Sequence, residues 1–152
     1  MTGNRILVPV RESVTLRNTV AYAAERAIDA ESGSTPTIHF VYPLSERVTV
    51  GDPPSEATEL LDRVKAWVEE DLDEHAETVG VQTSFVAREE YLFNPGDYAA
   101  VLSRYARRHD IDTVLLDPEF NPSGMTPLLP PLETELEGVG LDVEIAPVER
   151  PT

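Results

Sequence analysis

Short apolar runs alternate along this chain with longer stretches whose apolar residues recur at helical spacing. The apolar runs predict five buried strands, at residues 5–10, 37–42, 82–87, 112–116 and 142–148. The helical stretches predict four helices, at about 14–30, at about 55–78, from residue 94 onward and at about 131–137. This alternation of strand and helix predicts a parallel α/β sheet with helices on both faces.

Length and composition favour one folded domain, which we expect to span residues 1–152. Apolar residues make up 41% of the chain, enough to build a core. No apolar run approaches the length that spans a bilayer, and no amino-terminal stretch resembles a signal peptide, so we expect a cytoplasmic location. The chain has no cysteine, which excludes disulfides, thiolate nucleophiles and cysteine metal sites.

The charge balance is strongly acidic, with a formal net charge of −16 and a single lysine, Lys65. Such a surface repels nucleic acid, which we therefore exclude as a partner. Two interpretations of the acidity stay open. It suits a protein from a very salty cytoplasm, where a Debye length of about 3 Å screens self-repulsion. It also suits a surface that binds cations or a basic partner.

The predicted topology places a ligand mouth beyond the carboxyl ends of the strands, at the switch point of the sheet. The residues that follow or end those strands are Arg11, Glu12, Tyr42, Asp117 and Glu119. The turns after the first and fourth strands lack the glycines that would let a phosphate approach the backbone. The turn after the first strand has no glycine, and the turn after the fourth has none before residue 124. The scaffold therefore suggests nucleotide binding, whereas the turns lack the residues that hold phosphate.

Each group at this mouth has two interpretations. The Arg11-Glu12 segment either forms a salt bridge through its arginine to Asp117 or Glu119 and plugs the site, or its two residues remain solvated charges. Asp117 and Glu119 either bind a cation through oxygen atoms or serve as ordinary turn residues. The segment containing Ser123, Gly124 and Thr126 is either an anion-binding nest or simple turn chemistry.

Catalytic and metal sites find no support in the sequence. The three histidines, His39, His75 and His109, share no metal-ligand spacing, and we expect His39 to be either a core residue or a pH-sensing group. No serine lies in a Gly-x-Ser-x-Gly elbow. We therefore predict no catalytic residues, no metal site and no cofactor.

With these elements placed, the chain resembles the universal stress protein family over nearly its whole length. The resemblance rests on Ile6–Val10, the alanine-rich first helix, Asp97–Leu102 and His109–Leu116. It implies a three-layer α/β/α sandwich with five parallel strands in the order 3-2-1-4-5, in the adenine nucleotide alpha hydrolase-like class. It also implies a homodimer formed through the last strand, whose available side chains are Val143, Ile145 and Val148.

The chain departs from the ATP-binding members of that family at two places. Those members carry an aspartate where this chain has Arg11, and a Gly-x2-Gly-x9-Gly pattern followed by Ser or Thr where this chain begins with Asp117-Pro118-Glu119. Proline offers no amide hydrogen, and the two carboxylates repel phosphate. We therefore expect a domain that is degenerate for ATP binding. The alternative is a free-standing nucleotide-binding stress protein in which Ser123–Thr126 supplies the amides.

Three shorter stretches, Tyr91–Tyr98, Leu116–Phe120 and Ala146–Pro151, are similar to the amino-terminal domain of the E-type component of haloarchaeal monovalent cation/proton antiporters. This resemblance implies a regulatory or sensory domain that serves a sodium/proton antiporter, with membrane-embedded proteins of that antiporter as partners. In such proteins a membrane portion follows the stress-protein-like domain, so the chain is expected to be a domain of a longer protein.

Overall fold

The computed structural model describes residues 5–29, 36–45, 55–88, 95–118 and 132–147. Within these ranges five parallel strands form one sheet in the order β3-β2-β1-β4-β5. The strands are β1 (Arg5–Pro9), β2 (Thr37–Ser45), β3 (Gly80–Arg88), β4 (Thr113–Leu116) and β5 (Asp142–Ile145). The predicted sheet and its strand order are confirmed.

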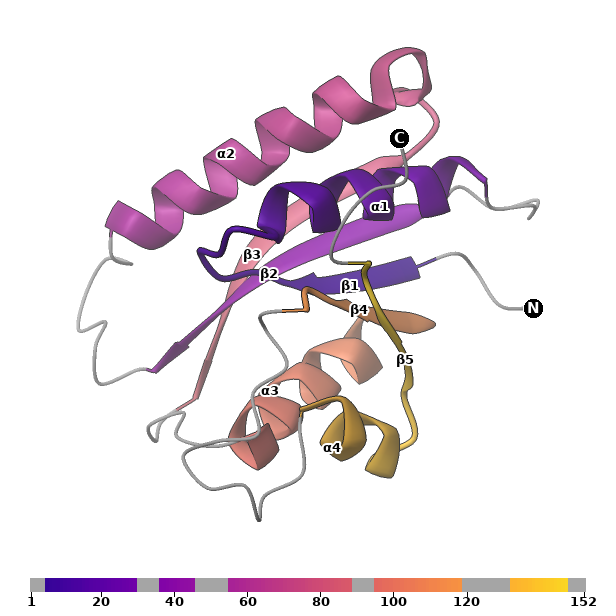
Figure 1. The fold of residues 1–152 in the computed structure, drawn as a ribbon. Coiled ribbons are helices and arrows are strands. Elements are labelled where there is room, and N and C mark those ends of the chain that lie inside the picture. The colour runs from indigo at the N-terminus through magenta and orange to yellow at the C-terminus, as the bar shows by residue number, and fades with distance from the viewer. Residues whose placement is uncertain (1–4, 30–35, 46–54, 89–94, 119–131, 148–152) are drawn as a thin grey trace.

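Helices cover both faces of this sheet, as Figure 1 shows. They are α1 (Leu16–Ile28), α2 (Ser55–Leu72), α3 (Pro95–Arg108) and α4 (Leu132–Gly138), and a 3-10 turn, η2 (Asp73–His75), follows α2. The first two helices lie on one face and the last two on the other, which gives the predicted three-layer sandwich.

The core is divided between the two faces because successive strand side chains point in opposite directions. On β1, Ile6 and Val8 pack with α1 and α2, whereas Leu7 packs with α3 and α4. Alanines on the buried side of α1, such as Ala23 and Ala24, have no long side chain and let this helix lie close to the sheet. Burying these apolar side chains provides the main drive for folding.

The second strand extends further than the sequence pattern predicts. We expected a loop from Pro43 onward, but β2 continues through Ser45 and stays paired with β3, with Pro43 opposite Val86. Proline lacks a ladder donor and is disfavoured inside a sheet. Here the pairing of β2 with β1 ends at Val41, opposite Pro9, so Pro43 lies where one side of β2 is already an edge.

Helix α2 and strand β5 end earlier than the sequence predicts. Helix α2 ends at Leu72 instead of near residue 78, and Asp73 adopts a left-handed φ of 48°. Strand β5 ends at Ile145, and Val148 lies outside the described residues.

A left-handed residue follows helix α3. There Asp110 has a φ of 53°, and the Ile111 amide donates to the Ala106 carbonyl. Aspartate tolerates this conformation, which ends the helix and turns the chain into β4.

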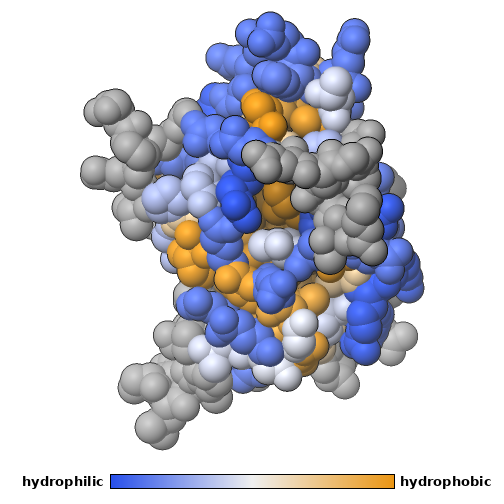
Figure 2. All heavy atoms as spheres, turned by 90° about the vertical axis from the view of Figure 1, so that its right-hand side faces the viewer, coloured by the Kyte–Doolittle hydropathy of each residue, from blue (hydrophilic) through white to orange (hydrophobic). Residues whose placement is uncertain are grey.

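The face on the right-hand side of Figure 1 is mostly hydrophilic, with an interrupted band of hydrophobic side chains through its middle (Figure 2). None of the helices in the described ranges is both long and apolar enough to cross a membrane.

Candidate functional site

The predicted mouth lies where β1 and β4 run side by side, and the helices that follow them, α1 and α4, lie on opposite faces of the sheet. Such a switch point is the usual ligand position in open parallel sheets. Arg11 and Glu12 follow β1, Tyr42 lies in β2, and Asp117 follows β4. The four described mouth residues do not form one cluster: Arg11 lies over the ring of Tyr42, whereas Glu12 and Asp117 each have other partners.

Asp117 is the most enclosed of these residues, with no exposed surface. Its carboxylate accepts hydrogen bonds from three hydroxyl groups. The Ser13 hydroxyl donates to Oδ2 over 2.6 Å, and the hydroxyls of Thr15 and Thr19 donate to Oδ1 over 2.6 and 2.7 Å. Three short donors compensate a buried charge that would otherwise be strongly unfavourable. Asp117 therefore joins β4 to the start of α1.

This arrangement places a negative charge at the amino-terminal end of α1. Thr15 is the N-cap residue, yet its side chain makes no capping hydrogen bond, since its hydroxyl donates to Asp117. Unpaired amides and the helix dipole make a helix start attractive to anions. The Asp117 carboxylate therefore occupies a position where this fold could otherwise attract an external anion.

Arg11 lies on the other side of the mouth and contacts aromatic rings. Its guanidinium donates to the Tyr98 hydroxyl over 2.7 Å and lies 5.8 Å from the ring centre of Tyr42 and 5.6 Å from that of Tyr98. Glu12 instead pairs with Arg63 of α2 over 3.0 Å. The described contacts do not include the ion pair from Arg11 to Asp117 that one interpretation required, because hydroxyls of α1 and its preceding turn surround that carboxylate.

The cation-site interpretation of Asp117 loses support for the same reason. Both of its carboxylate oxygens already accept hydrogen bonds from hydroxyls. In the part of the chain that the structure describes, no three histidine or acidic side chains come together as metal ligands. Glu119, Ser123, Gly124 and Thr126 lie outside the described residues, so the nest and the Glu119 contacts remain predictions.

His39 is a buried core residue, as the sequence predicted. Its Nδ1 lies 2.8 Å from the Tyr105 hydroxyl, and the Ser84 hydroxyl donates to the same oxygen over 3.3 Å. Burial lowers the pKa of His39 to about 4, with smaller electrostatic contributions in the same direction from the neighbouring His109 and Arg5. The ring is therefore neutral at pH 7, and the direction of its hydrogen bond with the Tyr105 hydroxyl depends on the tautomer.

The mouth has no catalytic arrangement among its described residues. Ser13 has Asp117 and Thr15 as its described hydrogen-bond partners, and neither is the histidine base of a serine nucleophile. The histidines lie elsewhere: His39 and His109 contact Tyr105, and His75 lies 3.8 Å from Glu74.

Strand β5 forms one edge of the sheet, as expected. Val143 and Ile145 are half-buried and pack against the α3–α4 side of the core. Glu144 points to the other face, where it pairs with Arg26 over 2.9 Å and accepts a hydrogen bond from Tyr22. The edge backbone can pair with another strand, but the side chains of Val143 and Ile145 are already partly buried within the chain.

Sequence reasoning missed the partners of Asp117. Hydroxyl side chains lie at and just before the start of α1, at Ser13, Thr15 and Thr19. The other buried side chains of this helix are leucine, valine or alanine. Hydroxyls at helical spacing on an apolar face were therefore the available signal for a polar partner.

Comparisons with known proteins support the fold. No family model matches the chain, and no curated protein matches it. Among solved structures it is similar to a universal stress protein family member from Burkholderia pseudomallei, at 23% identity and a TM-score of 0.61, covering 95% of this chain and 96% of that one. It is also similar to the universal stress protein from Archaeoglobus fulgidus in complex with dAMP, at 16% identity and a TM-score of 0.67, covering 97% and 100%.

A third solved structure, a universal stress protein in complex with cAMP, has 12% identity and a TM-score of 0.65, covering 98% of this chain and 100% of that one. The chain thus has the fold of universal stress proteins.

Proposed function

We propose that this chain is a non-catalytic regulatory or sensory domain with a universal stress protein fold, in which an internal carboxylate replaces the usual anionic ligand. The observation that carries the proposal is the buried Asp117, held by three hydroxyls at the start of α1. A phosphate approaching the same helix start would meet a like charge at short range.

The residues around Asp117 support the same conclusion. The hydroxyls of Ser13, Thr15 and Thr19 already donate inside the protein, so they offer no hydrogen to a phosphate oxygen. Pro118 has no amide hydrogen to replace them. Binding ATP here would require breaking short internal hydrogen bonds and leaving Asp117 beside a triphosphate.

The alternative is a nucleotide-binding stress protein. It is supported by the two structural neighbours in complex with dAMP and cAMP, and by Arg11, a cation that lies over two aromatic rings at the mouth. On this alternative the ligand would contact the Arg11 side of the mouth and leave Asp117 in place.

Calorimetric titration with Mg-ATP and with dAMP, in molar KCl to screen the acidic surface, tests the proposal. We expect no saturable heat up to millimolar ligand, with circular dichroism showing that the protein is folded. The Archaeoglobus fulgidus protein titrated with dAMP in the same buffer is the positive control. Micromolar binding of Mg-ATP would refute the proposal, and loss of that binding in Arg11→Gln would identify the Arg11 side as the site.

We further propose that the domain serves a sodium/proton antiporter and forms a homodimer through β5. The short-motif resemblance to the E-type antiporter component supports the first part, and the edge position of β5 supports the second. The coding sequence beyond residue 152 tests the antiporter link, because it should encode apolar segments of about 20 residues. An immediate stop codon would count against it.

A further inference from the structure

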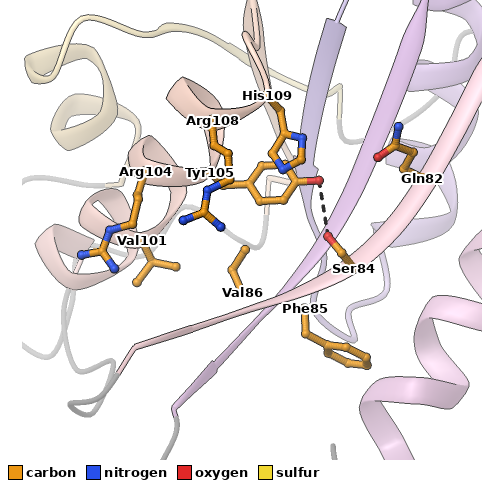
Figure 3. Close-up of a pocket in the computed structure, with 9 residues that line it drawn as sticks. All are labelled: Gln82, Ser84, Phe85, Val86, Val101, Arg104, Tyr105, Arg108 and His109. Carbon is orange, nitrogen blue, oxygen red and sulfur yellow. Dashed lines mark hydrogen bonds between the residues drawn. The ribbon is translucent and has the colours of Figure 1, made fainter.

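A cavity of about 410 Å³ lies between α3 and the edge strand β3, away from the mouth (Figure 3). We call it the α3–β3 groove. Its β3 side presents Gln82, Ser84 and Val86, which share one face of the strand, whereas Phe85 packs toward the opposite layer of the sandwich. A volume of this size suits a small molecule better than an inorganic ion.

Two arginines on α3, Arg104 and Arg108, border the groove one helical turn apart. None of the described lining residues is acidic, and neither arginine has an ion pair within the described part of the chain. This is unusual in a chain with 28 acidic residues. Four other arginines do pair with carboxylates: Arg5, Arg17, Arg26 and Arg63.

The helix itself explains only part of this arrangement. Cations near the carboxyl end of α3 interact favourably with the helix dipole. That interaction does not use the several N–H groups that each guanidinium offers, and these groups match phosphate or carboxylate oxygens in pairs. Residues at positions i and i+4 of a helix are close enough for Arg104 and Arg108 to contact one anionic group together.

The wall next to these arginines is apolar and firmly positioned. Val86 and the buried Val101 provide aliphatic surface. The Tyr105 hydroxyl is fixed between His39 and Ser84, and its ring stacks on His109 with centroids 4.1 Å apart. Figure 3 shows the Tyr105 ring between the arginines of α3 and Ser84 of β3. A preorganised wall lowers the ordering cost of binding.

We propose that the α3–β3 groove binds a small organic anion, with its phosphate or carboxylate group on Arg104 and Arg108 and its apolar part against Val86, Val101 and Tyr105. This site is independent of the mouth. Tyr98, the α3 residue that contacts Arg11, lies one to three helical turns before the groove residues of α3. The proposal therefore stands or falls separately from the proposed loss of ATP binding.

The experiment is titration of the isotope-labelled chain, followed by amide NMR shifts, with phenyl phosphate and with benzoate. Benzyl alcohol, which has a ring of similar size and no charge, is the ligand control. We expect saturable shifts at residues 82–86 and 101–109 with one or both anions, and none with the alcohol. The stronger of the two anions distinguishes a phosphate site from a carboxylate site.

Three variants sharpen the test. Arg104→Gln combined with Arg108→Gln should weaken the anion by at least about tenfold. Arg107→Gln removes one positive charge from the same helix, half the change of the double variant. Arg107 does not line the groove and donates to the Ser103 carbonyl, so this control should change affinity less than about twofold. Spectra of the unliganded variants verify folding, which these exposed substitutions should not disturb.

Several results would overturn the proposal. Equal losses in the double variant and in Arg107→Gln would indicate general surface charge. Benzyl alcohol binding as tightly as the anions would indicate an apolar pocket without anion selectivity. Shifts confined to Arg11, Tyr42 and Tyr98 would place the ligand at the mouth, and no saturable shift with either anion would show that the groove is not an anion site.

Discussion

At the carboxyl end of β4 a buried carboxylate is enclosed by hydroxyls from α1 and its preceding turn, whereas in the α3–β3 groove two arginines border a cavity with no described acidic residue. The first region satisfies its charge within the chain. The second leaves charged donors directed at solvent. In parallel α/β folds the carboxyl ends of the strands are the expected ligand position. Here two arginines that have no ion pair with a described residue, Arg104 and Arg108, lie instead beside the edge strand.

The largest effect that tests this comparison should come from Asp117→Ala. Removing the carboxylate leaves two buried threonine hydroxyls and the half-buried Ser13 hydroxyl without this acceptor, so we expect the free energy of unfolding to fall by about 3 kcal/mol. Urea denaturation in molar KCl, followed by fluorescence of Trp67, the only tryptophan in the sequence, measures it.

Asp117→Asn is the matched control, since it keeps the volume and one carbonyl acceptor and should cost less than the alanine variant. A loss below about 1 kcal/mol for Asp117→Ala would contradict the enclosed carboxylate. It would mean that water reaches the three hydroxyls and that the mouth is open.

The second effect concerns His39, which lies behind the groove wall. Its pKa is lowered to about 4 in the folded protein, so the unfolded chain takes up the proton first as the pH falls below 6.5. The free energy of unfolding should therefore decrease on acidification, by about 2 kcal/mol between pH 6.5 and 4.5 from this group alone. Denaturation curves at several pH values measure the slope.

Carboxylates of this acidic chain also titrate toward pH 4, so the slope must be compared with that of His39→Asn. The asparagine has no titrating ring and keeps an acceptor for the Tyr105 hydroxyl. We expect a shallower loss of stability in the variant than in the wild type over this pH window. Identical slopes would show that His39 does not titrate with a lowered pKa.

Sequence patterns predicted the fold better than the site. Apolar periodicity placed the strands and helices because burial of whole faces determines them. Asp117 was correctly placed at the end of β4, but its partners were not, since Thr15 and Thr19 are about 100 residues away along the chain and only the packing of α1 brings them close. For Arg11 the sequence suggested either an ion pair or a solvated charge, and neither interpretation included the rings of Tyr42 and Tyr98 that lie beside it.

The groove was not predicted because a cavity depends on how α3 packs across β3, which periodicity does not give. A signal was nevertheless present. Three of the 11 arginines, Arg104, Arg107 and Arg108, fall within five residues of an otherwise acidic chain. Local reversal of the overall charge is thus worth noting in a sequence even when no motif accompanies it.

The smallest effect compares one hydroxyl from each region. Thr19→Val removes a buried donor 2.7 Å from Asp117 and keeps the side-chain shape, so we expect a loss of about 1.5 kcal/mol in unfolding free energy. Ser84→Ala removes a half-buried donor 3.3 Å from the Tyr105 hydroxyl, and water in the groove can replace it. We expect that loss to stay below about 0.5 kcal/mol. Urea denaturation of both variants under one condition measures the difference. A larger loss for Ser84→Ala than for Thr19→Val would reverse the comparison, because the groove and not the mouth would then hold the more tightly enclosed polar network.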